Sequence, residues 1–266
     1  METRERIHYT DRELLQPTNP ISVNLIGAGG TGSKVLTSLM EMNHSLCELG
    51  HPGLQVRLWD DDKVSNANLG RQLFASSEIG LYKSVALINR VNRFSGTNWK
   101  AETRKFNGLN SEELSDSNIS TIYITAVDNV STRFEVSKTL NSYTNQYHYR
   151  NQPKYWLDFG NSQYTGQVFL STIGEINQPD SKKYTVVPCL PMITEEYGEL
   201  LKTSELNDNT PSCSLAEALE KQDLFINSSL TTMGCSLLWN LFRNGRTSYR
   251  GFFLNLKDFR SQPVPV

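Results

Sequence analysis

The sequence predicts an α/β fold in which helices cover both faces of a doubly wound, mostly parallel β-sheet with an antiparallel C-terminal extension. Three observations predict this fold. Strand-like apolar runs alternate with helix-like stretches over residues 21–160, a glycine-rich turn joins the first run to the first helix, and the alternation stops after residue 160. The length of 266 residues suits one large domain.

Each element of the parallel part has its own justification. Residues 21–26 form a short apolar run that ends at a glycine, which is typical of a buried parallel strand, and residues 121–127 repeat this pattern. The helix-like stretches place apolar side chains three or four positions apart. In order, the predicted strands are 21–26, 55–59, 99–106, 121–127 and 155–159, and the predicted helices are 30–43, 83–93 and 131–141.

The second half is expected to complete the same domain. Short strand candidates suggest an antiparallel extension, prolines mark an irregular crossing region, and a long apolar ridge predicts a helix that either packs in the core or forms a dimer surface. In order, these elements are strands at 165–171 and 184–187, a helix at 222–242, and a hairpin or edge strand at 247–256. The chain therefore divides into a charged arm (1–20), an alternating part (21–160) and a C-terminal part (161–266).

The composition argues against several classes of protein. A net charge of −2 gives no basic footprint for nucleic acid or for a membrane surface. No apolar run reaches the ~20 residues that cross a bilayer, and the charged N-terminus lacks the apolar core of a signal peptide. We therefore expect a cytoplasmic protein that binds neither nucleic acid nor membrane.

The cysteines do not form a metal-binding pattern. Cys47, Cys189, Cys213 and Cys235 stand alone, without the paired C-x-x-C spacing of a structural zinc site. We expect no zinc. Cys47 and Cys235 lie in helical patterns and are expected to be packing residues.

The glycine-rich turn is the first functional signal, because it lies between a predicted strand and a predicted helix. In a Rossmann-like fold such glycines permit a tight turn, the approach of a phosphate, and close strand–helix packing. Asp60 ends the second strand, where an acid would accept hydrogen bonds from ribose hydroxyls. These features predict nucleotide binding by residues 21–160 and leave NAD, FAD and ATP open; a solvated acidic loop is the alternative for Asp60. The turn contains Gly27, Gly29, Gly30 and Gly32.

The segment after Asp60 favours ATP. It contains Arg71 and Lys83, and a triphosphate with a charge of about −4 needs such cations around it. A nicotinamide cofactor has no need for them at this position.

The same segment resembles the signature of the ThiF/MoeB/HesA superfamily, which includes the ubiquitin-activating enzymes. That signature runs D-x-D-x-V, then S-N-L-x-R-Q and G-x-x-K, and the family's G-x-G-G-x-G and D-N-x-x-x-R blocks are also present, at 27–32 and 128–133. Two departures are Ala67, where the family often has serine, and the absence of a C-x-x-C zinc motif. The matched positions are Asp60, Asp62, Val64, Asn68, Leu69, Arg71, Gln72, Gly80 and Lys83.

The resemblance implies a role for each site residue. Asp60 would hold the ATP ribose, with Asp62 and Gln72 in the same nucleotide site. Asn68, Arg71 and Lys83 would bind the phosphates, and the two cations would stabilise the charge that develops as a carboxylate attacks the α-phosphorus. Asp128 would carry Mg²⁺ near the attacking carboxylate.

Each assignment has a structural alternative. Lys83 could be a solvated surface lysine and Arg71 a salt-bridge partner. Asp128 could cap the following helix, and Asn66 and Asn68 could be turn residues.

The C-terminal half carries a second, shorter resemblance. Residues 211–215, PSCSL, resemble the segment around the transfer cysteine of ubiquitin-like activating enzymes, so Cys213 is a candidate for a thioester, with Cys189 second. A small buried cysteine is the alternative. This half as a whole resembles the ThiF-like proteins of the PRTRC system, which implies a ubiquitin-like β-grasp protein and a conjugating-enzyme-like protein as partners.

We therefore expect a homodimeric enzyme that uses ATP and Mg²⁺ to adenylate the C-terminal carboxylate of a ubiquitin-like β-grasp protein. Transfer of that protein to Cys213 is a further hypothesis. The alternatives are an NAD-dependent oxidoreductase and a non-catalytic nucleotide-binding adaptor.

Overall fold

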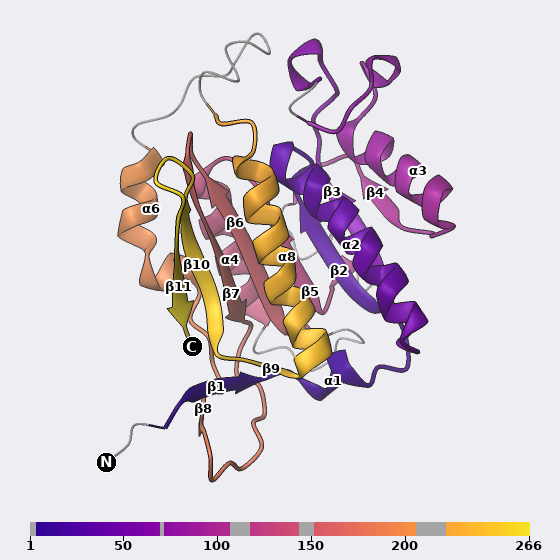
Figure 1. Cartoon of the computed structure of the whole chain (residues 1–266). Helices are drawn as coiled ribbons and strands as arrows, with labels where there is room; N and C mark the ends of the chain where they lie inside the picture. Colours follow the sequence, from indigo (N-terminus) through magenta and orange to yellow (C-terminus); the bar gives the residue numbers. More distant parts are fainter. Residues whose placement is uncertain (1–3, 70–71, 107–117, 144–151, 206–221) are drawn as a thin grey trace.

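The computed structural model describes residues 4–69, 72–106, 118–143, 152–205 and 222–266. In this part of the chain, eight strands form one sheet in the order β11-β10-β7-β6-β5-β2-β3-β4 (Figure 1). The strands are β2 (Ile21–Ile26), β3 (Leu54–Trp59), β4 (Lys100–Glu102), β5 (Ile122–Thr125), β6 (Tyr155–Asn161), β7 (Thr165–Thr172), β10 (Tyr249–Asn255) and β11 (Arg260–Pro265).

The sheet has a parallel and an antiparallel half. Strands β4, β3, β2, β5 and β6 run parallel to one another. Strands β7, β10 and β11 continue the sheet with antiparallel pairing. This arrangement confirms the predicted fold class, and the proline-containing strand β11 lies at the sheet edge, where a missing backbone donor is tolerated.

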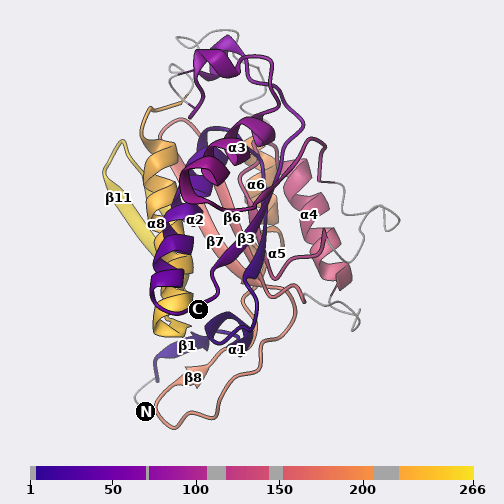
Figure 2. The ribbon, with the colours of Figure 1, turned by 90° about the vertical axis from the view of Figure 1, so that its right-hand side faces the viewer.

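Helices cover both faces of the sheet, as Figure 2 shows from its edge. Each face has its own apolar core, in which fully buried side chains such as Leu39, Leu58 and Leu140 each contribute about 1.5–3 kcal/mol by leaving water. On one face lie α2 (Gly30–Glu48), α3 (Lys83–Ser95) and α8 (Ile226–Asn244), and on the other lie α4 (Val130–Tyr143), α5 (Ile193–Glu196) and α6 (Gly198–Glu205).

Helix α8 is a core element. It packs against α2 and against strands β6 and β7. Leu230, Leu238 and Leu241 are completely buried. The sequence allowed the apolar ridge of this helix to be either core or dimer surface, and in the structure it belongs mainly to the core. Gly234 makes the close approach possible, because a Cβ at this position would lie 2.5 Å from the ring of Phe159.

A small second sheet joins the N-terminal segment to the C-terminal half. Strand β1 (Arg6–Tyr9) pairs in parallel with β8 (Thr185–Val186) and antiparallel with β9 (Arg246–Thr247). The strand candidate at 184–187 was expected to extend the main sheet, and this expectation is wrong, because β8 lies in the small sheet. Its backbone pairs instead with the segment predicted to be a charged arm, in which α1 (Arg12–Leu15) also buries Leu14.

A buried histidine fastens β1 to the main sheet. The Nδ1 atom of His8 lies 2.7 Å from the carbonyl oxygen of Val187, and its Nε2 atom lies 3.0 Å from the hydroxyl of Tyr155. The hydroxyl of Tyr155 in turn accepts a hydrogen bond from the backbone N–H of Asp11. A neutral ring with its proton on Nδ1 satisfies every one of these groups, and burial lowers the pKa of His8.

The stability of the protein is therefore expected to fall as the pH drops below about 6.5, the ordinary pKa of histidine. In that window the unfolded chain binds a proton at His8 that the folded chain does not, so the free energy of unfolding decreases as the pH falls. The measurement is the urea midpoint of wild type and His8→Gln from pH 7.5 to 5. The stability advantage of the wild type over the variant should shrink across this range.

His44→Gln serves as the control, because His44 lies exposed on α2. It should keep the pH profile of the wild type. A constant difference between wild type and His8→Gln at every pH would contradict the assignment.

None of the helices in the described ranges combines the length and the apolar character that crossing a bilayer requires.

Candidate functional site

The predicted site residues follow neighbouring strands at one edge of the main sheet. Because β5, β2 and β3 are adjacent and parallel, their carboxyl ends lie at the same edge. The glycine turn follows β2, Asp60 follows β3 and Asp128 lies beyond β5. In open α/β sheets, this edge is where ligands bind.

The glycines of the turn serve different purposes. Gly27 has a φ of +99°, and a Cβ there would lie 2.5 Å from the carbonyl oxygen of Ala126. A Cβ at Gly32 would lie 1.9 Å from the carbonyl oxygen of Gly27, so these two glycines allow the turn and its packing on the sheet. A Cβ at Gly29 would meet nothing within 4 Å, and this glycine therefore borders open space.

Helix α2 begins at this open side. Gly29 occupies its N-cap position and offers no side-chain acceptor to the first turn. The backbone N–H of Ser33 donates to the carbonyl oxygen of Gly29 at 3.0 Å, so the helical N–H donors that precede Ser33 lie at the positive end of the helix without an acceptor within it. A phosphate group fits this arrangement.

Asp60 binds the glycine turn through its backbone. Its Oδ2 accepts a hydrogen bond from the N–H of Ala28 at 2.7 Å, and its Oδ1 accepts one from the N–H of Asp62 at 3.0 Å. Each carboxylate oxygen keeps a second lone pair, which a ribose hydroxyl could use. Burial is the largest influence on Asp60 and raises the pKa of its carboxyl, although the amide of Ala28 and the charge of Lys83 act in the opposite direction.

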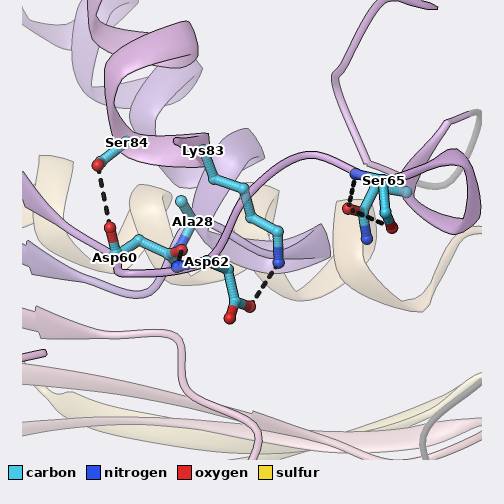
Figure 3. Close-up of polar contacts among 7 residues, drawn as sticks. Ala28, Asp60, Asp62, Ser65, Lys83 and Ser84 are labelled. Atoms are coloured by element: carbon cyan, nitrogen blue, oxygen red, sulfur yellow. Dashed lines mark hydrogen bonds and ion pairs between the residues drawn. The ribbon is translucent and has the colours of Figure 1, made fainter. Parts of the chain in front are cut away.

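Lys83 lies beside this carboxylate and forms an ion pair with Asp62 (Figure 3). The distance from its Nζ to Oδ2 of Asp62 is 2.7 Å. The start of α3 is fixed to the same loop, because Ser84 Oγ donates to the carbonyl oxygen of Asp60 and the N–H of Lys83 donates to that of Asp62. The side chain of Lys83 is only 9% exposed, so it is not a freely solvated surface lysine.

Asn68 and Gln72 lie in the loop between β3 and α3. The Oδ1 atom of Asn68 accepts hydrogen bonds from the N–H and the hydroxyl of Ser65, so this side chain does stabilise a turn. Gln72 is buried, its N–H donates to the carbonyl oxygen of Asn68, and its Oε1 has no partner among the described residues.

Asp128 is exposed in the loop between β5 and α4. The helix is capped by its neighbour, because Oδ1 of Asn129 accepts from the N–H of Thr132 at 2.8 Å. The cap is therefore Asn129, and the carboxylate of Asp128 remains available to a ligand.

A buried ion pair between Arg133 and Asp158 supports the loop that carries Asp128. Neither residue was among the predicted site residues. Arg133 Nε lies 3.2 Å from Oδ1 of Asp158, and this oxygen also accepts a hydrogen bond from the hydroxyl of Thr125. Arg133 Nη2 donates to the carbonyl oxygens of Val127 (2.7 Å) and Phe159 (2.9 Å). The sequence signal was a carboxylate inside an otherwise apolar strand, which requires a buried partner.

The remaining residues that the sequence analysis considered are Arg71 and the four cysteines. Arg71 and Cys213 lie outside the described residues. Cys189 is exposed and its Sγ accepts from Thr172 Oγ1 at 3.6 Å. Cys235 is buried, as expected for packing, and burial raises its pKa to about 12, whereas Cys47 is exposed.

No three His, Cys, Asp or Glu side chains of the described residues come together as a metal-binding group.

The chain is similar to known proteins in sequence family and in fold. The ThiF family matches residues 6–262. No curated protein matches the chain.

Solved structures with the same fold include MccB of E. coli with MccA (14% identity, TM-score 0.58) and PaaA (13%, 0.57), each over 96% of this chain and 65% of that one. MccB of E. coli with ATP is also similar, with 14% identity and a TM-score of 0.55 over 95% of this chain. The chain thus spans about 65% of the length of these structures.

Proposed function

Because the chain belongs to the ThiF family over almost its whole length, we propose that it is an ATP-dependent adenylyltransferase that activates the C-terminal carboxylate of a partner protein. The observation that carries this proposal is the grouping of Asp60, Asp62 and Lys83 around the glycine turn. An open phosphate position at Gly29, a ribose-accepting carboxylate and a shielded cation together suit a nucleoside triphosphate.

The residues at the carboxyl ends of the parallel strands have different roles in the proposed reaction. The backbone donors at the start of α2 bind phosphate, and Asp60 binds the ribose. Asn68, Gln72, Arg71 and Lys83 complete the phosphate site. The carboxylate of the partner attacks the α-phosphorus, the bond to the bridging oxygen breaks, and pyrophosphate leaves.

Lys83 must turn from Asp62 to the phosphates when ATP binds. The cost is small, because 67% of the Asp62 side chain is exposed and its carboxylate can return to water.

Asp128 is the residue that would hold Mg²⁺. Its exposed carboxylate follows β5 at the same edge, and carboxylate oxygen is a preferred ligand of this ion. Bound there, the ion would neutralise phosphate charge.

The partner we propose is a ubiquitin-like β-grasp protein, in keeping with the sequence resemblance to the PRTRC subgroup. The active form we propose is a cytoplasmic homodimer. A conjugating-enzyme-like protein would be a second binding partner. Structures of MccB with MccA and with ATP support a site that takes both a polypeptide and a nucleotide.

The test is ATP–pyrophosphate exchange measured with candidate β-grasp proteins. We expect exchange only when protein, ATP, Mg²⁺ and a partner with a free C-terminal carboxylate are all present. ATP binding without exchange for any partner would favour the adaptor, and stabilisation by NADH in place of ATP would favour the oxidoreductase.

Transfer of the activated partner to Cys213 is the finer part of the proposal. A Cys213→Ala variant should still catalyse exchange and should lose an adduct that thiols cleave, as seen by mass spectrometry. Cys189→Ala is the matched control and should keep the adduct. A thiol-cleavable adduct that persists in Cys213→Ala and disappears in Cys189→Ala would move the thioester to Cys189.

A further inference from the structure

A buried amide from the C-terminal half reaches the glycine turn. Asn227 lies in the first turn of α8 and is only 1% exposed. Its Oδ1 accepts hydrogen bonds from Thr31 Oγ1 at 2.9 Å and from Asn161 Nδ2 at 2.5 Å. Its Nδ2 donates to Gln222 Oε1 at 3.2 Å. Both lone pairs of the amide oxygen are therefore used, and they join the start of α2 to the end of β6.

Asn227 also explains one glycine of the turn. A Cβ at Gly30 would lie 2.5 Å from Nδ2 of Asn227, so the amide occupies the space that a side chain would need. Gly29, by contrast, borders open space. The two central glycines thus have different surroundings: Gly30 faces Asn227, and Gly29 faces open space.

The contacts of Asn227 with α2 fall within the glycine motif, at Gly30 and Thr31. The apolar packing of α8 is carried by other residues of the helix. Leu230, for example, packs against Gly166 of β7. Removal of the amide should therefore loosen the turn without removing the apolar contacts that hold α8 on the sheet.

We propose that Asn227 is a positioning residue for nucleotide binding, which holds the first turn of α2 so that the backbone donors of the glycine turn point toward the phosphates. This inference rests on the proposed function. Asn227 acts through Thr31 and Gly30 and does not touch the nucleotide itself. Without the amide, the glycine turn must be ordered at the moment ATP binds. This ordering costs part of the binding free energy, so the affinity for ATP falls.

The test is the Kd for ATP, measured by isothermal titration calorimetry on the full chain without a partner protein. We expect Asn227→Ala to raise this Kd roughly tenfold, which corresponds to about 1.4 kcal/mol. Thr31→Val removes the hydroxyl that Asn227 accepts from and should have an effect in the same direction. Thr31→Ser keeps this donor and should bind ATP like the wild type.

Two controls separate positioning from general loss of stability. Leu230→Ala should lower the Tm but leave the Kd for ATP unchanged, because Leu230 is fully buried and packs against Gly166 of β7. The double variant Asn227→Ala/Thr31→Val should bind ATP little worse than the weaker of the two single variants, since both remove the same hydrogen bond.

Each outcome has a definite meaning. Wild-type affinity in Asn227→Ala, or equal losses in Thr31→Ser and Thr31→Val, would overturn the positioning role and leave the adenylyltransferase proposal intact. A wild-type chain that does not bind ATP would overturn both.

Discussion

Lys83→Ala is expected to lower the rate of ATP–pyrophosphate exchange by roughly 10²–10³-fold, the usual loss when one donor to developing negative charge is removed. Lys83 is held at the site by the backbone of α3 and by Asp62, and its ammonium group lies close enough to Asp60 to influence the pKa of that carboxyl. No other lysine of this segment is buried, within the described residues. Because the charge is needed mainly in the transition state, kcat should fall more than the KM for ATP rises.

The control for this prediction is Lys63→Ala. Lys63 lies in the same loop, is exposed and has its Nζ 5.1 Å from the ring centroid of Tyr82, so its removal should leave exchange near the wild-type rate. Lys83→Gln removes the charge but keeps a polar side chain, one atom shorter, with an N–H donor, so it separates the loss of charge from any change of fold. Near-normal exchange in a folded Lys83→Gln protein would exclude Lys83 from the chemistry.

Arg133→Met is expected to lower the free energy of unfolding by about 3–5 kcal/mol, because it leaves the carboxylate of Asp158 buried without its cation. Asp158 is 1% exposed and its Oδ2 already lacks a partner among the described residues. The same variant should also slow exchange, since Arg133 holds the carbonyl oxygen of Val127, the residue before Asp128. Urea unfolding and the exchange assay measure the two effects.

Two comparisons make this prediction specific. The double variant Arg133→Met/Asp158→Leu should recover part of the lost stability, because no buried charge remains unpaired. Arg250→Met should cost less than Arg133→Met, because its partner Glu196 has a side chain that is 39% exposed and can be solvated. If Arg250→Met cost as much as Arg133→Met, burial of the partner charge would not be the cause.

Local patterns located most elements, and their errors have identifiable causes. The predicted strand at 21–26 and the start of the predicted helix at residue 83 agree with the structure. Helix α2 continues beyond residue 43 to Glu48, because polar residues on an exposed face do not end a helix. Strand β4 is shorter than the predicted 99–106, because its neighbour β3 ends at Trp59, opposite Glu102.

The partners of a strand or of a buried charge are not encoded locally. An alternating run predicts a strand but does not say which strand pairs with it, so β8 could not be assigned to the small sheet from sequence. In the same way, D-N-x-x-x-R indicated Arg133, but Asp158, 25 residues away, became its partner only in the folded chain.

The sequence by itself determined the fold class, the glycine turn and the order of carboxylates and cations after it, because these depend on periodicity and on residues close together in the chain. The tertiary structure decided that Asn227 meets Thr31 across 196 positions and that His8 meets Val187 across 179. Such contacts depend on which faces of distant elements are buried together, and that choice is made by packing the whole domain at once.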